Sequence, residues 1–218
     1  MENTLKEKKV SRDSFGKYEE LLKKWQKTIN LVSPKTLSNL WERHFADSLY
    51  LYDFIKDKDL IIDIGSGAGF PAMVLAIAGS NEKNFPKIVM IEADERKCFF
   101  LQEIKRAYNL KDTQVEIKNI RVENLNKDIE EKGNSDYEQK AKYITGRAFA
   151  PLDKFLDLCK TIIDSNTEMY LLKGDNIQEE IKEAKNHWDF QTSIYKKDNG
   201  TVTKVWDIKK NRTTDRSI

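Results

Sequence analysis

Residues 60–71 read L-I-I-D-I-G-S-G-A-G-F-P, and this stretch decides the fold. An apolar run ends at Asp63 and passes directly into three alternate glycines, Gly65, Gly67 and Gly69. Glycine has no Cβ, so its backbone can adopt positive φ and a ligand can approach its N–H groups closely. A buried strand that leads through a glycine-rich turn into a helix therefore predicts a nucleotide-binding site in an α/β protein.

The spacing of the glycines separates one kind of nucleotide from another. The dinucleotide-binding motif G-x-G-x-x-G requires its third glycine at position 70, where this chain has Phe70. The pattern D-x-G-x-G-x-G instead resembles motif I of the class I S-adenosylmethionine (SAM) methyltransferases, in which the glycines make room for the methionine part of the ligand. The motif alone leaves open other α/β nucleotide-binding folds and a glycine turn that is only structural.

Length and composition limit the remaining possibilities. A chain of 218 residues fits one α/β domain with an appendage. No apolar run approaches the roughly 18 residues that cross a bilayer, and residues 1–9 lack the apolar stretch of a signal peptide. We therefore expect a cytoplasmic protein without a membrane partner. Cys98 and Cys159 lie outside any C-x-x-C motif, so we expect two buried, reduced thiols and no metal site.

Charge is distributed unevenly, although the net charge is only +2. Residues 1–30 carry eight Lys and Arg against five Asp and Glu, and residues 196–218 carry seven against three. Residues 123–140 have the opposite balance, with six acidic and three basic side chains. Basic ends would suit a phosphate-rich substrate, but an ordinary solvated surface accounts for the same pattern.

Two amphipathic helices are predicted before the first strand. Apolar residues recur at three- and four-residue steps from Phe15 to Ile29, and a second set extends from Leu37 to Leu49. We therefore expect residues 1–58 to form an N-terminal helical cap and residues 59–218 to form the core.

Strands and helices alternate along the core. We expect strands at 60–64, 87–91, 115–117, 143–145 and 169–172, and helices at 71–78, 95–108 and 152–163, with a charged, exposed insertion at 126–140. Such alternation predicts a parallel sheet with helices on both faces. Asn199-Gly200 between two alternating runs predicts a closing hairpin. The pattern as a whole resembles the class I SAM-dependent methyltransferase (Rossmann-like) fold, a seven-stranded, mostly parallel sheet with an antiparallel C-terminal hairpin.

The ligand of such a sheet lies beyond the carboxyl ends of the strands. Asp63 ends the first strand and can fix the glycine loop or bind the ammonium of the ligand through water, unless it only caps the loop. Glu92 ends the second strand, where a carboxylate can accept hydrogen bonds from both ribose hydroxyls. Val122 and Glu123 follow the third strand and are expected beside the adenine ring, although Glu123 can equally be a solvated acid at a helix start.

The segment T-G-R-A-F, residues 145–149, separates one methyl-transfer chemistry from another. It lacks the [N/D/S]-P-P-[F/Y/W] motif of enzymes that methylate base amines. Both cysteines lie on predicted helices, so neither is expected in the cleft, where methylation of cytosine C5 requires one. Ribose 2′-O enzymes combine a lysine with acidic partners; Lys173 could be such a lysine, but no aspartate stands at the end of the fourth strand. Guanine N7 has an unprotonated lone pair at neutral pH, so its methylation requires alignment, which can supply about 7–11 kcal/mol, and no base. An arginine near the site, Arg147, fits that requirement.

A series of motifs in order along the chain resembles one family. The chain resembles the RsmG (GidB) family of bacterial 16S ribosomal RNA guanine-N7 methyltransferases. The motifs are N-L-V-S (30–33), R-H-F-A-D-S-L (43–49), D-I-G-S-G-A-G-F-P (63–71), E-A-D-E-R-K-C-F-F-L (92–101), R-V-E (121–123), G-R-A-F-A (146–150) and L-K-G (172–174).

The resemblance implies SAM as methyl donor and a guanine in the decoding-region loop of 16S rRNA as acceptor. The expected partner is 16S rRNA or a small-subunit precursor particle, and the expected state is a monomer. Three alternatives stay open: a methyltransferase that acts on another RNA nucleotide or on a small molecule, an NAD enzyme, and a catalytically silent RNA-binding module. His44 can also be a bonded scaffold residue. Together with the positions of the motifs, the resemblance implies two sets of site residues. The residues expected at the cofactor are Asp63, Gly65, Gly67, Gly69, Phe70, Glu92, Val122, Glu123 and Arg147, and Arg147 is also the expected positioning residue. The residues expected on the substrate side are Arg43, His44 and Lys173.

Overall fold

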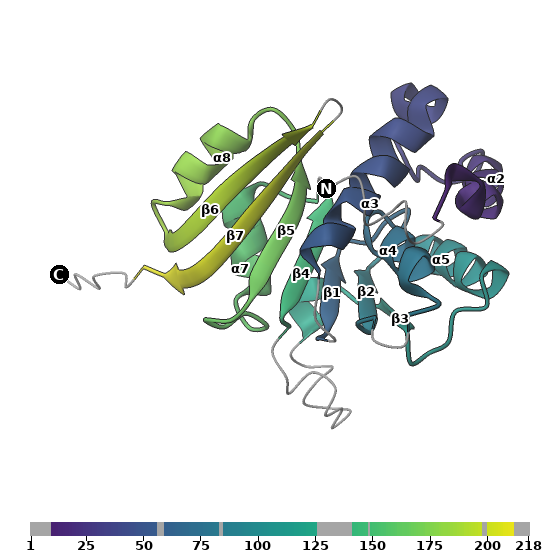
Figure 1. Ribbon diagram of the computed structural model, residues 1–218. Helices are drawn as coiled ribbons and strands as arrows, with labels where there is room; N and C mark the ends of the chain where they lie inside the picture. Colours follow the sequence, from purple (N-terminus) through teal and green to yellow (C-terminus); the bar gives the residue numbers. More distant parts are fainter. Residues whose placement is uncertain are drawn as a thin grey trace.

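The computed structural model describes residues 10–55, 59–82, 85–125, 141–147, 149–197 and 200–211. These residues form a seven-stranded sheet in the order β3-β2-β1-β4-β5-β7-β6 (Figure 1). The first five strands are parallel, and β7 is antiparallel to both β5 and β6. The predicted sheet and its closing hairpin are confirmed. The strands are β1 (Ile61–Ile64), β2 (Ile88–Glu92), β3 (Val115–Asn119), β4 (Tyr143–Arg147), β5 (Glu168–Lys173), β6 (Trp188–Lys197) and β7 (Gly200–Lys210).

Helices cover both faces of the sheet. Helices α4 (Ala72–Gly79) and α5 (Glu95–Ala107) pack on one face, and α7 (Leu152–Cys159) and α8 (Ile177–Ala184) pack on the other. Strands β1 and β2 are buried on both faces, which is why they are apolar without alternation, apart from Asp63 in β1 and Glu92 at the end of β2. Helix α7 ends four residues earlier than predicted, and α8 was not predicted, although it buries one residue per turn of an otherwise charged segment.

The N-terminal cap differs from the prediction in its second part. Its first helix is present as η1 (Arg12–Phe15) and α2 (Gly16–Trp25). The single helix predicted from Leu37 to Leu49 is wrong, because the helical pitch of the chain changes within that range. It forms the 3₁₀ segment η2 (Pro34–Asn39), the π-helix η3 (Trp41–Ala46) and the short α-helix α3 (Asp47–Tyr50), before the 3₁₀ turn η4 (Leu51–Phe54).

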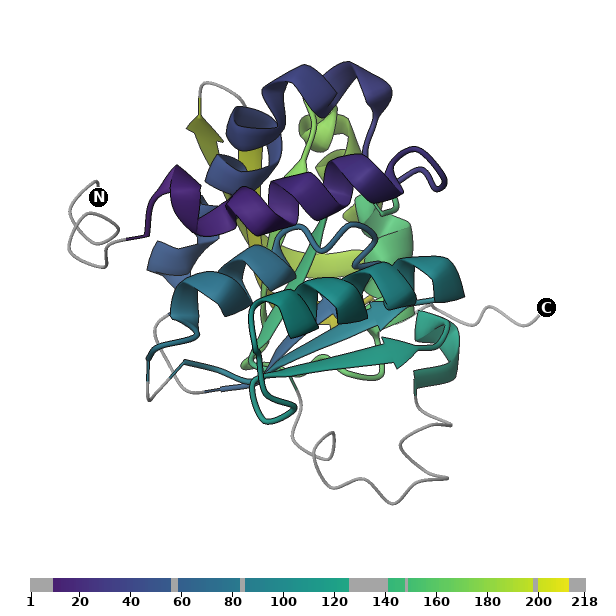
Figure 2. The ribbon, with the colours of Figure 1, turned by 90° about the vertical axis from the view of Figure 1, so that its right-hand side faces the viewer.

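The cap shares its apolar core with the helices on its side of the sheet. Figure 2 shows α2 lying across α4 and α5. Tyr18 and Phe45 from the cap are fully buried in the same cluster as Phe70 and Phe100 from the rest of the chain. The division of the chain at residues 58 and 59 into a cap and a core stays a prediction, since the two parts are packed together throughout the described residues.

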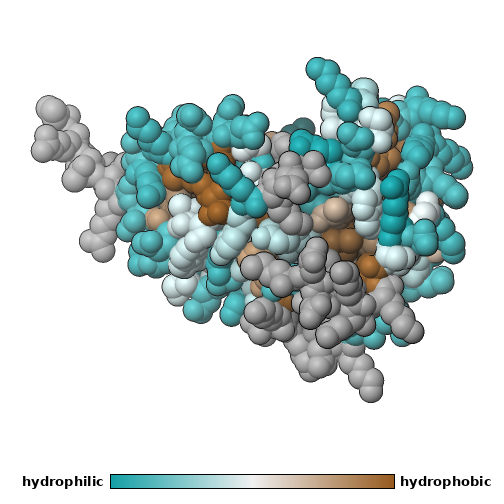
Figure 3. Space-filling view, turned by 45° about the horizontal axis from the view of Figure 1, so that its top comes forward, coloured by the Kyte–Doolittle hydropathy of each residue, from teal (hydrophilic) through white to brown (hydrophobic). Residues whose placement is uncertain are grey.

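The remaining expectations about the chain concern its cysteines and its surface. Cys98 and Cys159 are free and buried, as predicted. The face drawn in Figure 3 is mostly hydrophilic, with hydrophobic residues reaching it in small patches. Within the described ranges, no helix has both the length and the apolar character needed to cross a membrane. The charged insertion at 126–140 and the tip of the hairpin at 198–199 lie outside the described residues.

Candidate active site

The glycine loop after β1 has the backbone conformation that its sequence predicts. Gly65, Gly67 and Gly69 have φ of 67°, 54° and 90°, which are left-handed values that side chains with a Cβ rarely adopt. The N–H groups of Gly65 and Ser66 both donate to the carbonyl of Ile91 at the end of β2, at 3.0 Å. The loop is therefore tied to the carboxyl ends of two adjacent strands.

Tyr18 from the cap holds the loop on its other side. Its hydroxyl donates to the carbonyl of Ala68, and its ring lies parallel to that of Phe70, with 5.5 Å between the ring centroids. A Cβ at Gly69 would overlap with the Tyr18 hydroxyl and come within 2.9 Å of the Met73 Cβ. In the sequence, Tyr18 is one position of an apolar helix face, and nothing in the helical pattern distinguishes it from Leu22.

Asp63 lies buried beneath the loop. Its Oδ1 accepts a hydrogen bond of 2.7 Å from the Thr145 hydroxyl, while its Oδ2 is buried without a partner among the described residues. The pKa of Asp63 is raised to about 6: burial is the largest cause and raises it, the hydrogen bonds of Thr145 and Ser66 lower it, and the charge of Glu92 raises it. A buried carboxylate oxygen without a partner fits a cationic ligand group, such as the ammonium of SAM.

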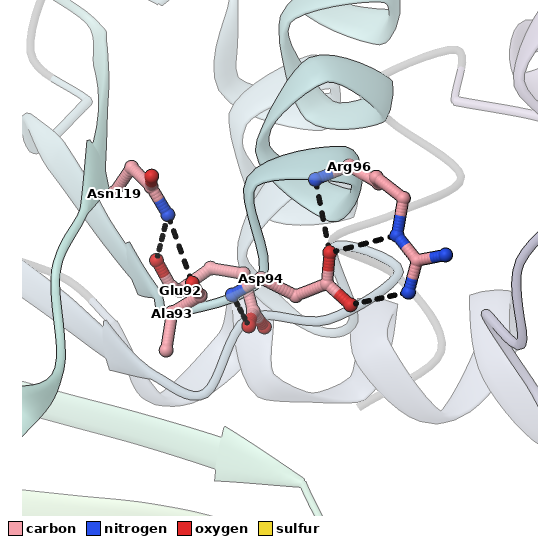
Figure 4. A network of polar contacts seen from close by, with 5 residues as sticks. All are labelled: Glu92, Ala93, Asp94, Arg96 and Asn119. Atoms are coloured by element: carbon pink, nitrogen blue, oxygen red, sulfur yellow. Dashed lines mark hydrogen bonds and ion pairs between the residues drawn. The ribbon is translucent and has the colours of Figure 1, made fainter.

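Glu92 is fixed at the end of β2 by backbone donors. Its Oε2 accepts from the N–H of Gly67 and its Oε1 from the N–H of Asp94, both at 2.8 Å. Figure 4 shows the second of these contacts, together with the Asn119 amide that donates to the carbonyls of Glu92 and Ala93 at 3.1 Å. Each carboxylate oxygen keeps one further acceptor position, so a rigidly held Glu92 can still accept from the hydroxyls of a ribose.

A pocket of about 300 Å³ lies between the cap and the glycine loop. The cap contributes residues 31–33, Thr36 and His44, and the core contributes residues 65–68, Phe70 and Arg147. The structure thus brings Gly65, Gly67, Phe70, His44 and Arg147 together. It does not bring Val122 or Glu123 to this pocket: on η5 (Val122–Asn124), Val122 is buried and Glu123 is exposed, and their role at an adenine ring stays a prediction.

Arg147 connects the end of β4 to the cap. Its Nη2 donates to the backbone carbonyl of Arg43 and lies 3.7 Å from the Asp47 carboxylate. Its Nη1 is buried and has no partner among the described residues. Burial lowers the pKa of Arg147, the Asp47 carboxylate raises it, and the Arg43 charge lowers it. One nitrogen of the guanidinium therefore anchors the side chain, and the other is left for a ligand.

His44 lies on the π-helix, a rare conformation that often occurs at functional sites. Its Nε2 is 2.9 Å from the Thr36 hydroxyl, and its ring is 4.9 Å from that of Phe70. Burial, together with the charges of Arg147 and Arg43, lowers the pKa of His44 to about 3. The imidazole is therefore neutral at any pH at which the protein is expected to work.

Arg43 and Lys173, the other two residues predicted on the substrate side, do not line the pocket that His44 lines. The side chain of Arg43 is exposed, and its backbone carbonyl serves as the anchor of Arg147. Lys173 does not line the pocket. Its ammonium donates to the carbonyl of Ala150 and, at 2.7 Å, to the carboxylate of Glu180, so it orders the segment after β4.

Phe149 and Thr36 are site residues that the sequence analysis did not assign. The Phe149 ring packs against Gly65, where a Cβ would overlap with it, and 43% of the residue is exposed. Its place in the segment T-G-R-A-F was the available signal. Thr36 lies just before the second predicted helix, and nothing in its sequence context marks it as a site residue. Across the ranges that the structure describes, no three or more His, Cys, Asp or Glu side chains gather as they would around a metal ion.

Comparison with known proteins decides the family. The family model described as "GidB: rRNA small subunit methyltransferase G" matches residues 11–205. A ribosomal RNA small subunit methyltransferase G from Orientia tsutsugamushi (strain Ikeda) is 38% identical over 204 residues, covering 92% of each chain. The chain belongs to this family. A relative with the same name from Dinoroseobacter shibae is 37% identical over 187 residues, covering 85% of this chain and 89% of its own.

Solved structures with low sequence identity support the fold of this family member. A methyltransferase from Geobacter sulfurreducens has a TM-score of 0.56 at 15% identity, with 90% of this chain and 89% of that chain covered. A mutant form of MtNAS in complex with SAM has a TM-score of 0.57 at 9% identity, covering 89% of this chain and 71% of that chain. The fold is the predicted class I SAM methyltransferase fold.

The residues present fit SAM, the methyl donor of this methyltransferase family. The left-handed glycines leave space along the loop, Asp63 Oδ2 offers a buried acceptor, and Glu92 offers two oriented oxygens. When bound, SAM supplies a methyl group on a positively charged sulfur that a lone pair can attack directly. The contacts of each of these residues with SAM remain predictions.

Proposed function

We propose that this protein transfers the methyl group of SAM to N7 of a guanine in the decoding-region loop of 16S ribosomal RNA. The printed names of the relatives support small-subunit ribosomal RNA as the substrate class. The observation that carries the choice of atom is the absence of a competent base among the described residues that line the pocket. Their titratable side chains are His44 and Arg147.

Neither of these two side chains is suited to remove a proton from a substrate at neutral pH. The neutral imidazole of His44 has a pKa of about 3 and is therefore a very weak base. Arg147 is an arginine, which stays protonated in proteins. Guanine N7 needs no base, because its lone pair is already free in the ring plane. What the residues of the site contribute is position: Arg147 is anchored on Arg43, and Phe149 packs on Gly65.

We extend the proposal to partners, location and organisation. The substrate is 16S rRNA or a small-subunit precursor particle, the protein is a cytoplasmic monomer, and residues 1–58 act as a cap on a core formed by residues 59–218. The lining of the pocket supports this division into cap and core, since the cap contributes residues 31–33, Thr36 and His44 to it.

The experiment incubates purified protein with labelled SAM and small-subunit RNA, both naked and within the 30S particle. The RNA is then digested to nucleosides, and the label is identified by mass spectrometry. We expect 7-methylguanosine as the labelled product. Label on an exocyclic amine, a C5 carbon or a ribose oxygen would contradict the proposal and favour another RNA nucleotide as acceptor. RNA without any label, together with methyl transfer to a small molecule, would exclude RNA as the substrate.

A further inference from the structure

The hydrogen bonds around Thr36 determine which nitrogen of His44 carries the proton. The Thr36 hydroxyl oxygen lies 2.8 Å from the carbonyl oxygen of Ser33 and 2.9 Å from His44 Nε2. A carbonyl can only accept, so the single hydroxyl proton of Thr36 must lie on the Ser33 side. The Thr36 oxygen then accepts from His44, and Nε2 must carry the imidazole proton.

His44 Nδ1 is consequently a bare acceptor. A neutral imidazole has one proton, and that proton is on Nε2. Nδ1 is buried without a partner among the described residues, on a residue that is only 7% exposed and lines the pocket. A buried acceptor without a donor is costly unless a ligand supplies one. The same pocket holds a buried donor without an acceptor, Arg147 Nη1.

An acceptor and a donor in one pocket suit a ligand that presents a donor and an acceptor along one edge. With N7 held at the methyl group, guanine presents O6, which accepts, and then N1–H, which donates. Adenine presents the reverse order, an amine that donates and then a bare N1 that accepts. The amino-acid end of SAM also combines an acceptor and a donor. An ammonium beside His44, however, would be repelled by the positive charges of Arg147 and Arg43, which both act on His44. The buried Oδ2 of Asp63 is a better partner for a cation.

We propose that Thr36 fixes the imidazole of His44 as the Nε2–H tautomer, so that Nδ1 accepts from N1–H of the target guanine while Arg147 Nη1 donates to O6. Thr36 is then a positioning residue, and His44 is a residue that selects the base. This inference rests on the proposed function, because it takes guanine as the acceptor base.

The acceptor at His44 Nδ1 also suits the product of N7 methylation. A methyl group on N7 gives the base a positive charge, and this makes N1–H a stronger hydrogen-bond donor. An acceptor at N1–H therefore binds the methylated base, and the transition state that leads to it, more strongly than the free base. The weak basicity of His44, whose pKa is about 3, allows it to accept this hydrogen bond without taking the proton.

The first arm of the test reads the tautomer directly in the free protein. The chain has only two histidines, so ¹⁵N-histidine labelling gives two pairs of ring-nitrogen signals, and His187→Gln assigns each pair to its residue. Long-range ¹H–¹⁵N correlation should give His44 as the Nε2–H tautomer. Thr36→Val should produce a mixture of tautomers, and Thr36→Ser, which keeps the hydroxyl, should restore the wild-type signal. An Nδ1–H tautomer in the wild type would overturn the inference whatever the substrate is.

The second arm measures base selection. RNA is prepared with guanine or 2,6-diaminopurine at the methylated position. The analogue keeps N7 and the 2-amine but carries an amine at C6 and a bare N1. Wild type should prefer guanine by at least about 100-fold in kcat/KM, since a site built for one hydrogen-bond pattern rejects its inverse. Thr36→Val should reduce that preference at least about 5-fold, because an imidazole free to become Nδ1–H can donate to the analogue. Thr36→Ser should retain it.

Controls separate this inference from the proposed function. His187→Gln, which changes an exposed histidine bonded to Asp153, should leave kcat/KM and base preference unchanged. SAM affinity should change less than about 3-fold in Thr36→Val. An equal loss of SAM affinity and of kcat/KM would assign the pair to the cofactor and overturn the inference. The inference is also overturned if Thr36→Val keeps the full preference for guanine. A wild type that does not methylate guanine N7 at all would instead overturn the proposed function.

Discussion

Asp63 combines a structural cost with a proposed binding role. Its Oδ2 is buried without a partner among the described residues, and burial is the largest cause of the raised pKa, about 6, in the folded protein. Between the ordinary pKa of 3.8 and 6, the folded state binds more protons than the unfolded state. The contribution of Asp63 to the free energy of unfolding therefore falls as pH rises through this range. A ligand cation beside Oδ2 would offset this cost.

We therefore expect Asp63→Asn to stabilise the ligand-free protein and to weaken SAM binding. A pKa raised from 3.8 to about 6 corresponds to about 3 kcal/mol. The free energy of unfolding of the variant should exceed that of the wild type by up to that amount above pH 7 and approach it near pH 4. His44, whose pKa is lowered, gives the opposite slope in both proteins and cancels in the comparison. SAM affinity should fall about 10- to 100-fold, the loss of a hydrogen bond to a charged group.

Urea unfolding from pH 4 to pH 8 measures the first effect, and calorimetry with SAM measures the second. Parallel pH profiles for the two proteins would contradict the raised pKa of Asp63. Unchanged SAM affinity would make Asp63 a residue of the loop scaffold only.

Arg147 is expected to act on turnover more than on cofactor affinity. Arg147→Lys keeps a positive charge but loses the planar fork that bonds the Arg43 carbonyl with one nitrogen and leaves the other in the pocket. We expect kcat to fall at least about 10-fold while the Kd for SAM changes less than about 3-fold, because alignment acts on the step from bound complex to transition state. Arg106→Ala, which removes an exposed charge from the end of α5, is the control. Equal losses in Kd and kcat would make Arg147 a cofactor-binding residue.

At the scale of elements, the contact between α2 and the glycine loop fixes the cap on the core. The Tyr18 hydroxyl donates to the Ala68 carbonyl and occupies the space that a Cβ at Gly69 would need. Gly69→Ala should therefore destabilise the protein through two separate causes, its φ of 90° and the overlap with Tyr18. Only the second cause depends on the tyrosine hydroxyl.

A double-mutant cycle separates the two causes. Tyr18→Phe alone should lower the free energy of unfolding by about 1 kcal/mol, the net contribution of one hydrogen bond. Gly69→Ala should lower it by about 2 kcal/mol or more. The double variant should be more stable than the sum of these losses predicts, by about 1 kcal/mol, because the missing hydroxyl leaves room for the Cβ. Additive losses would show that the overlap is relieved elsewhere, and that Tyr18 does not fix the loop.

The elements that could be predicted are those whose local pattern agrees with their surroundings. Strands β1 and β2, the glycine loop and the Asn-Gly hairpin follow from apolar runs and turn residues. The cap segment from Pro34 to Ala46 could not be predicted in the same way. Its spacing of apolar residues fits an α-helix, but tertiary contacts, among them those of His44 with Thr36 and Phe70, accompany its 3₁₀ and π geometry.

At the scale of the whole molecule, the pocket lies between the cap and the core. The core contributes the glycine loop and Arg147, which we propose to bind SAM, whereas the cap contributes Thr36 and His44, which we propose to select the base. Motif order along the chain predicted the family, the fold and five of the eleven residues that line the pocket. It could not predict the hydrogen bonds of Thr36, the partnerless Oδ2 of Asp63 or the use of Lys173 as a structural contact, because each depends on the backbone path and the side-chain packing, and the order of motifs specifies neither.

The central claim is methylation of guanine N7 in 16S rRNA, and its product can be located directly. N7 methylation gives guanine a fixed positive charge, which makes the ring reducible by borohydride and the RNA strand cleavable by aniline at that nucleotide. The measurement compares RNA from cells with and without this protein. RNA from cells that lack the protein should lose one cleavage in the decoding-region loop of 16S rRNA, and purified protein with SAM should restore it. An unchanged cleavage pattern, or restoration at a different nucleotide, would contradict the account.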